Sequence, residues 1–292
     1  SVTALTGQRD VASPHRTVHG ITQVVPWNNI DNVGPAGSIN SNVRDMAQWI
    51  RFQLGHGTIG GKTLVSAGAL NETRTPQTII PMSGFFSVLF PTAHFVSYAM
   101  GWLSYDYHGH SAIWHNGGID GFSAMVAMLP DDGFGVVVLT NVENTLVYNA
   151  IADWLFDRHL QQPVHDWSSD MHTVVAKQAA NADAAEAHEQ AQRVPGTHPT
   201  LALDQYAGTY VDSAFGTATV RLDNGKLIFN RGSRMVGDLE HWNYDTFRAT
   251  WRTGDADHNL LTFDLTADGK VASIRTDIGG DTLILHRIPG PA

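Results

Sequence analysis

Cysteine is missing from the sequence altogether, and lysine occurs only four times in 292 residues. Without cysteine the chain cannot form disulfides, bind metals through thiolates or use a cysteine nucleophile. Acidic residues outnumber basic ones by 28 to 18, which gives a formal net charge of -10. A nucleic-acid-binding protein needs clustered Lys and Arg to neutralise phosphates, so this charge argues against that class. No uninterrupted apolar stretch is long enough to span a bilayer, so a transmembrane segment is not expected.

The remaining composition is that of a globular protein, with 42% hydrophobic and 16% charged residues. A chain of this length forms one large domain or two ordinary ones and can bury a full core. The sequence begins at Ser1, without methionine and without a signal-peptide pattern. We therefore expect a mature, processed or truncated chain whose true start lies upstream.

The N-terminal third alternates between irregular and helical patterns. Prolines break up residues 1–35, which we expect to form a long loop or wrapping segment. Apolar spacing and capping residues predict a helix over 41–54 and a short helix near 66–74. Residues 77–97 are expected to be a loop, which either borders a substrate cleft or packs on the surface through its own Phe residues.

Strand patterns dominate the middle of the chain. The last two predicted strands are almost wholly apolar and are joined by the turn Asp131–Gly133. Because they do not alternate polar with apolar residues, we expect both strands to lie centrally in a sheet that is covered on both faces. The four predicted strands cover residues 98–106, 111–116, 121–129 and 134–140.

A helix, a linker and a region of short predicted strands complete the sequence. The helix predicted over 143–160 is expected to pack on the sheet through four apolar side chains. Residues 168–193 read as a polar, Ala-rich helical linker, and the Pro-Gly segment after it marks a domain boundary. From Leu201 onward, short strands with Asn-Gly, Asp-Gly and Gly-Gly turns predict a small antiparallel barrel or sandwich. The four apolar side chains of the helix predicted over 143–160 are Val147, Ile151, Trp154 and Leu155.

The strongest candidate for chemistry is the segment His115-Asn116-Gly117-Gly118, at the end of a predicted strand. Two residues without side chains let a backbone N–H approach a ligand closely, and an adjacent His or Asn can hold a carboxylate or an oxyanion. The alternative interpretation is structural, since two glycines can also form a turn or a bulge before the hairpin.

Two other kinds of site find less support in the sequence. His108, His110 and His115 could share a metal, but "YHGHS" is typical of a hairpin turn, and no carboxylate has a recognisable ligand spacing. A serine nucleophile with a lysine base one helical turn away is not encoded, because no Ser or Thr stands three residues before any lysine. Tyr-x-Asn is absent as well, and Ser38-Ile39-Asn40 is interpreted as a turn leading into the first long helix.

Taken together, "GPAGSINSNVRDMAQWIRFQL" and "WHNGGIDGFSAMVAMLPDDGFGVVVLTN" strongly resemble the serine β-lactamase-like, penicillin-binding-protein-like hydrolases. The likeness is to their class C-like branch of esterases, D-aminopeptidases and carboxypeptidases. It implies an α+β fold, with part of a β-lactamase-like antiparallel sheet flanked by helices and a small lipocalin-like barrel after it. The implied domains are the C-terminal portion of a catalytic domain (1–165), a helical linker (166–198) and an accessory β-domain (199–292).

Family members carry Ser-x-x-Lys, then Tyr-x-Asn, then Lys-Thr-Gly or a variant, and this sequence matches the third motif alone. By the resemblance, His115-Asn116-Gly117 stands where Lys-Thr-Gly would, as in non-lactamase members, so β-lactam resistance is not expected. Gly118 would donate its N–H to an oxyanion hole, while His115 and Asn116 would position the substrate or the proton-transfer network. No cofactor or metal is implied.

The first two motifs would then lie on an N-terminal chain or segment, either cleaved from this chain but still bound to it or left out by truncation. The implied activity is acyl-enzyme hydrolysis of a peptide, another amide or a small ester. The alternative is a non-catalytic ligand-binding or regulatory protein of the same fold. The resemblance implies a periplasmic or secreted bacterial location, although the lack of cysteine suits a cytoplasmic protein equally well.

Overall fold

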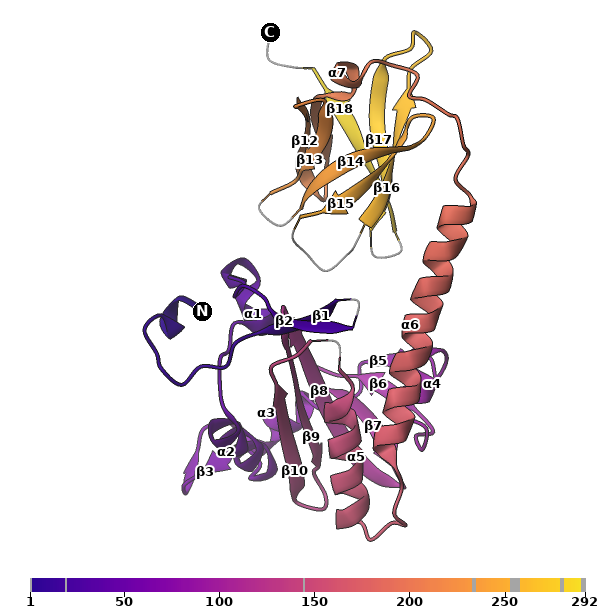
Figure 1. Cartoon of the computed structure of the whole chain (residues 1–292). Helices are drawn as coiled ribbons and strands as arrows, with labels where there is room; N and C mark the ends of the chain where they lie inside the picture. The colour runs from indigo at the N-terminus through magenta and orange to yellow at the C-terminus, as the bar shows by residue number, and fades with distance from the viewer. Residues whose placement is uncertain are drawn as a thin grey trace. The chain divides into compact units, whose positions relative to one another are not determined.

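A computed structural model describes residues 2–18, 20–143, 145–232, 235–252, 258–278 and 281–289 of the chain (Figure 1). Its contacts divide the chain into two compact units, Ser1–Ala182 and Asp183–Ala292. The first unit mixes helices with an antiparallel sheet, and the second is a closed antiparallel barrel. The α+β fold class expected from the sequence is confirmed, while the two domain boundaries set at 165 and 198 remain predictions.

The sheet of the first unit is a six-stranded antiparallel meander in which each strand pairs with the next one along the chain. Its order is β10-β9-β8-β7-β6-β5. Two-residue and four-residue turns join the last three strands, and the first of these turns uses Gly121 at φ +84°, a conformation that favours glycine. The strands are β5 (Thr78–Ile80), β6 (Val96–Tyr98), β7 (Leu103–Tyr107), β8 (His110–Ile119), β9 (Phe122–Leu129) and β10 (Phe134–Thr140).

Helices cover both faces of this sheet. α2 begins after Asn42, whose side chain accepts hydrogen bonds from two backbone N–H groups, and it places Ile50 against Ile113 and Met128 on one face. α5 packs Phe156 on the opposite face, among the side chains that include Trp114. The helices of the first unit are η1 (Val2–Leu5), η2 (Asp31–Val33), α1 (Gly34–Gly37), α2 (Val43–Leu54), α3 (Ala67–Glu72), α4 (Phe85–Leu89) and α5 (Val147–His159), and α6 (Trp167–Ala191) begins in the first unit and ends in the second. No helix among the described residues is long and apolar enough to cross a membrane.

The expected burial of both faces holds only in part, since no residue of β9 is exposed whereas β10 is half-buried throughout apart from the exposed Leu139, and the expected central position of β10 is wrong. Among the described residues β10 pairs with β9 alone and forms one edge of the sheet. It is apolar on both faces because α2 lies over one face and α5 over the other, with Val137 on the α2 side and Val136 and Val138 on the α5 side. The pattern of apolar residues in a strand indicates whether its two faces are covered, but it does not indicate which strands pair with its edges.

The packing face expected for α5 is also wrong. Of the four expected residues, Val147, Ile151 and Trp154 are 42%, 39% and 47% exposed and Leu155 is half-buried, while the opposite face of the helix is buried. That buried face contains Asp157, whose carboxylate accepts hydrogen bonds from Tyr107 Oη and from the Trp167 indole N–H, both at 2.6 Å. Because these donors come from distant parts of the chain, the apolar pattern of the helix could not reveal them.

Two regions that we expected to be irregular contain short elements. Residues 1–35 include the hairpin of β1 (His15–Val18) and β2 (Ile21–Val24), and 77–97 contain β5, α4 and most of β6. The strand expected over 98–106 is split, since β6 ends at Tyr98 and β7 begins at Leu103. A further hairpin joins β3 (Thr58–Ile59) and β4 (Lys62–Thr63).

The second unit is a closed eight-stranded barrel, as the resemblance implied. Each strand pairs with its successor, and β11 closes the ring by pairing with β18. The interior is filled by aromatic and aliphatic side chains, among them Tyr210, Phe247 and Phe263. Its elements are α7 (Leu203–Tyr206), β11 (Gly208–Asp212), β12 (Gly216–Asp223), β13 (Lys226–Asn230), β14 (Val236–Asn243), β15 (Thr246–Trp251), β16 (His258–Leu265), β17 (Val271–Ile278) and β18 (Asp281–Ile288).

Candidate functional site

Strand β8 changes character at His115. Residues 112–114 of β8 are buried, Ile113 and Trp114 pair with both β7 and β9, and the pairing with β7 ends where Leu103 lies opposite Trp114. Residues 115–119 pair with β9 only, among the residues that the structure describes. The second half of β8 therefore presents one open backbone edge, and Asn116, Gly117 and Gly118 lie exposed along it. An open strand edge can hydrogen-bond an extended ligand.

Gly117 and Gly118 form part of the strand and make neither a turn nor a bulge. They lie opposite Ala124 and Ser123 in an uninterrupted register, and the turn follows at residues 120–121. A Cβ on Gly118 would have no atom within 4 Å, and one on Gly117 would reach only the Ala124 Cβ, at 4.0 Å. Nothing within the described chain requires glycine here, so the smooth surface is available to something outside it.

His115 is held by two hydrogen bonds. Its Nδ1 lies 2.6 Å from the Asn116 carbonyl oxygen, which can only accept, so Nδ1 carries a proton. Its Nε2 lies 3.1 Å from Tyr98 Oη, a hydroxyl that can donate or accept. The imidazole therefore presents a fixed orientation at the start of the open edge.

The side chain of Asn116 is also positioned by a tyrosine. Its Nδ2 donates to Tyr148 Oη at 3.3 Å, and Tyr148 itself is buried in the first turn of α5. Tyr98 and Tyr148 were not predicted from the sequence, because neither belongs to a recognisable motif. One signal for Tyr148 was present, since Tyr148, Ala152 and Phe156 form an i, i+4, i+8 stripe on the buried face.

The turn that ends β8 is fastened to the N-terminal hairpin. Gly121 donates its N–H to Glu143 Oε2 at 2.9 Å, and its carbonyl oxygen accepts from the His15 N–H at 3.0 Å. Arg16 forms an ion pair with Glu143 and lies 3.8 Å from Asp120. A Cβ on Gly121 would stand 2.5 Å from the Pro14 side chain, so this close approach requires glycine. The far end of the candidate site is therefore rigidly placed.

A polar cluster lies inside the unit behind β8. The Trp114 indole N–H and Asn149 Oδ1 are buried without a partner and line, with Asp153, a cavity of about 10 Å³, the size of one water molecule. Burial, and secondarily the neighbouring Asp157, raises the pKa of the Asp153 carboxyl well above its usual range. Burial likewise raises the pKa of Tyr105. The Asp153 carboxyl is therefore protonated over a wider pH range than the carboxyl of a surface Asp.

The histidines considered for a metal site lie apart. The His108 ring is 3.4 Å from Asp157, His110 pairs with Asp132 at 2.9 Å, and His115 contacts Tyr98 at the other end of β8. The described parts of the chain contain no group of three His, Cys, Asp or Glu side chains that could hold a metal ion.

The arrangement can bind and polarise a substrate, but its own serine is unsuited to attack. Ser123, opposite Gly118, is buried, and its hydroxyl donates to the Val142 carbonyl at 3.0 Å. What the site offers is an open strand edge, a smooth Gly-Gly surface, and an oriented imidazole and carboxamide. Such groups can hold a carbonyl oxygen and a substrate backbone.

Known proteins resemble the chain over most of its length. The unguisins hydrolase ungD of Aspergillus violaceofuscus is 31% identical over 258 residues, which are 77% of this chain and 43% of that protein. The unguisins hydrolase ungD' of Aspergillus campestris is 28% identical over 70% of this chain and 38% of its own. The chain thus spans less than half the length of these curated relatives, which are fungal.

Two solved structures resemble it more weakly. The octameric penicillin-binding protein homologue from Pyrococcus abyssi aligns at a TM-score of 0.44 with 15% identity, over 97% of this chain and 55% of the other. SurE aligns at 0.36 with 19% identity, over 97% of this chain and 57% of its own.

Family models match both units of the chain. A model described as "Domain of unknown function (DUF3471)" matches residues 192–285, which include the barrel strands up to β17 and most of β18. The beta-lactamase model matches residues 3–161, more than half of the chain and all of the six-stranded sheet. The protein therefore belongs to the beta-lactamase family, a family of hydrolases.

Proposed function

We propose that this chain is the substrate-binding part of a serine hydrolase that cleaves a peptide, another amide or a small ester through an acyl-enzyme. The observation that carries the proposal is the open edge of β8, where His115, Asn116 and Gly118 lie exposed or half-buried beside a backbone without a second strand. The names of the two fungal relatives, both hydrolases, support hydrolysis.

In this proposal each residue of the motif has a separate task. The Gly118 N–H donates to the carbonyl oxygen that becomes an oxyanion, because no side chain blocks its approach. The Asn116 carboxamide, held by Tyr148, and the His115 imidazole, held by Tyr98, orient the substrate or the proton-transfer network. An attacking serine and its lysine base come from a Ser-x-x-Lys segment that is not encoded in these 292 residues.

Two uncovered surfaces of the first unit support the presence of such a segment. The exposed apolar stripe on α5, formed by Val147, Ile151 and Trp154, lies on the helix that covers β9 and β10. β10 also has no second strand partner among the described residues. Apolar stripes and open strand edges ordinarily lie against another part of a protein, so an N-terminal segment or chain is the proposed cover.

The proposal is tested on the native preparation with a fluorophosphonate probe for active-site serines. We expect the label on a chain or segment that co-purifies with these residues and carries Ser-x-x-Lys. Absence of label from every chain, with ligand binding intact, would favour the alternative of a non-catalytic binding protein and overturn the hydrolase.

A second variant tests the role of Gly118 separately. Gly118→Ala should leave the melting temperature unchanged, because the added Cβ meets no atom within 4 Å, yet lower kcat/KM, because the methyl group crowds a substrate carbonyl that approaches the retained Gly118 N–H. Gly68→Ala is the matched control, since Gly68 in α3 is equally unobstructed and distant from the motif in sequence. Full activity in Gly118→Ala would contradict the close approach of a substrate to this glycine surface.

A further inference from the structure

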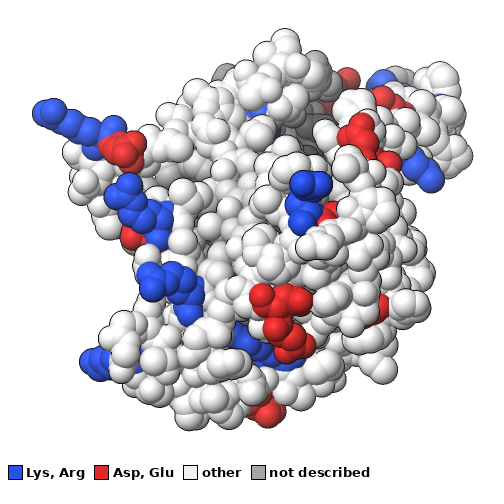
Figure 2. All heavy atoms as spheres, turned by 90° about the horizontal axis from the view of Figure 1, so that it is seen from below, with Lys and Arg blue, Asp and Glu red and all other residues white. Residues whose placement is uncertain are grey.

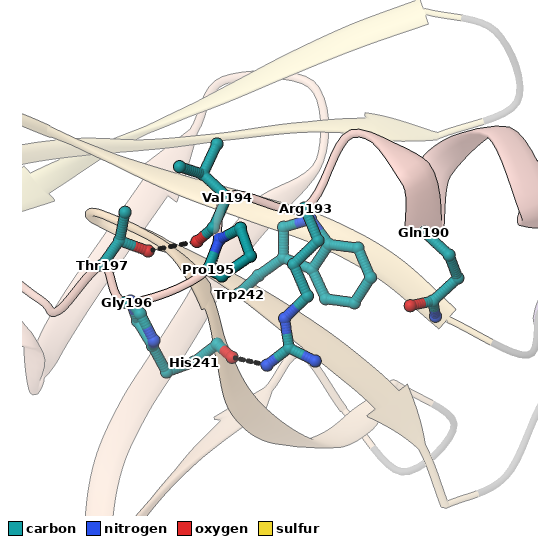
Figure 3. A pocket seen from close by; sticks show the side chains of 8 residues that line it. All are labelled: Gln190, Arg193, Val194, Pro195, Gly196, Thr197, His241 and Trp242. Atoms are coloured by element: carbon teal, nitrogen blue, oxygen red, sulfur yellow. Dashed lines mark hydrogen bonds between the residues drawn. The ribbon is translucent and has the colours of Figure 1, made fainter.

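The barrel unit carries a cavity outside its filled interior. The cavity has a volume of about 430 Å³ and lies between the C-terminal end of α6, the turn that follows it and strand β14 (Figure 3). Volumes of this size are typical of sites for small organic ligands and exceed what a single small ion occupies. Because the barrel interior is packed with aromatic side chains, a ligand of this unit would bind on its outside.

A bulge in β14 places a tryptophan at the cavity. His241 pairs with Phe247 and Asn243 pairs with Thr246, so Trp242 is the extra residue between them. Trp242 is 5% exposed although it lies on a barrel strand beyond the packed interior, and it forms one wall of the cavity together with Val194 and Pro195. Bulges of this kind re-aim side chains next to functional sites.

Arg193 brings a positive charge to the same cavity. Its guanidinium lies 5.0 Å from the centre of the Trp242 ring and donates one hydrogen bond to the His241 carbonyl oxygen, at 3.4 Å. Figure 3 shows the guanidinium next to the carbonyl oxygen of His241 and below the indole of Trp242 in this view. That hydrogen bond uses one of five N–H donors in a planar group whose geometry matches a carboxylate.

The acidic side chains nearby have other partners. Glu186 pairs with Arg248 at 2.8 Å, and Glu189 pairs with His258 at 2.9 Å. No carboxylate among the described residues forms an ion pair with Arg193, and no residue that lines the cavity is acidic. In a chain of net charge -10 the cavity is therefore locally positive.

We propose that this cavity is a binding site for a small organic carboxylate with an apolar body. The carboxylate binds the Arg193 guanidinium, and the apolar body lies against Val194, Pro195 and Trp242. An inorganic anion would leave most of the volume and the apolar walls uncovered, so the structure favours an organic acid. The proposal is independent of the catalytic role proposed for β8.

Calorimetric titration of the whole 292-residue chain tests it, with N-acetyl-phenylalanine as the probe and its uncharged amide as the matched ligand. We expect the acid to bind saturably and at least about tenfold more tightly than the amide, because the charge-assisted hydrogen bonds are lost with the amide. Arg193→Gln should abolish this preference. Arg221→Gln, which removes an exposed arginine that pairs with Asp223 elsewhere on the barrel, should keep it.

One further variant and one further measurement show whether the result is specific to this cavity. Gly118→Ala should not change the titration, since a loss of affinity there would place the acid at β8. The melting temperature of Arg193→Gln should equal that of the parent, because the side chain is exposed. Equal affinity for acid and amide, undiminished preference in Arg193→Gln, or no saturable binding would each overturn the proposal.

Discussion

The two units of this protein treat the edges of their sheets in opposite ways. In the barrel every strand has a neighbour on each side, because β11 pairs with β18. In the six-stranded sheet the outer strands β5 and β10 have one strand partner each among the described residues, and half of β8 is open as well. In a closed barrel the strands have no unpaired edge, whereas an open sheet has edge strands whose backbone N–H and C=O groups are available for binding.

The cores of the units differ in the same sense. The barrel interior is aromatic and aliphatic, while the core of the first unit buries the carboxyl groups of Asp153, which lines a void, and Asp157. A filled, closed core stabilises its own unit. An open sheet with buried carboxyl groups and an exposed apolar stripe depends on whatever covers it. Three variants test this difference, in order from the largest expected effect to the smallest.

Phe247→Ala should destabilise the barrel alone. The side chain is 1% exposed, and the centre of its ring lies 5.2 Å from that of Tyr206 and 5.5 Å from that of Phe263. Its loss leaves a cavity that lowers the free energy of unfolding by about 3–5 kcal/mol. Calorimetry should show one thermal transition lowered by about 10 °C or more and the other unmoved. Phe215→Ala, at a residue 45% exposed, is the control and should shift neither transition appreciably. A joint shift of both transitions in Phe247→Ala would mean that the units unfold as one.

Asp153→Asn should change how the stability of the first unit depends on pH. The raised pKa means that the folded state holds this proton where the unfolded state has lost it. Stability therefore falls as pH rises from the unfolded pKa, about 3.9, up to the folded pKa, by at most about 1.4 kcal/mol per pH unit. The uncharged amide removes that slope, so the variant should be the more stable at neutral pH.

Urea unfolding between about pH 4 and about pH 8 measures this effect. Asp170→Asn serves as the control, because Asp170 is exposed and pairs with the exposed His165. Parallel pH profiles for the parent and Asp153→Asn would show that the buried carboxyl is not linked to folding.

The double variant Ile151→Gln, Trp154→Gln should change association more than stability. Both side chains are more than a third exposed, so the free energy of unfolding should change by no more than about 0.5 kcal/mol. The parent chain alone is expected to self-associate through the stripe on α5, and sedimentation velocity should show less association in the variant. Val164→Gln, at an 80% exposed residue outside α5, should behave like the parent. A parent that remains monomeric at high concentration would contradict the need for cover.

Local patterns in the sequence predicted the elements whose structure depends on interactions between residues close together in the chain. Runs with Asn-Gly and Asp-Gly turns indicated the barrel strands, and the helix expected over 168–193 is found as Trp167–Ala191. The hairpin of β1 and β2 was missed because its position depends on long-range bonds, such as that from the His15 N–H to Gly121. The buried face of α5 was missed for the same reason, since Tyr107 and Trp167 satisfy Asp157 from outside the helix.

The candidate site was predicted in part. The motif at 115–118 was placed at the end of a strand, and the structure places it within the open half of β8. Its supporting tyrosines were not predictable, because Tyr98 and Tyr148 reach it from β6 and α5 through packing. The proposed tasks of His115, Asn116, Gly117 and Gly118 remain predictions until a complete enzyme is assayed.

The pairing that closes the barrel also brings its two ends together. Thr209, near the start of the first strand, lies opposite Ile288 at the end of the last. A folded module whose N- and C-terminal ends are neighbours can be inserted into or removed from a polypeptide without separating the segments on either side of it. Such a module can be joined to a gene, exchanged or deleted in one recombination event, so the barrel and the hydrolase-family unit can have separate evolutionary histories.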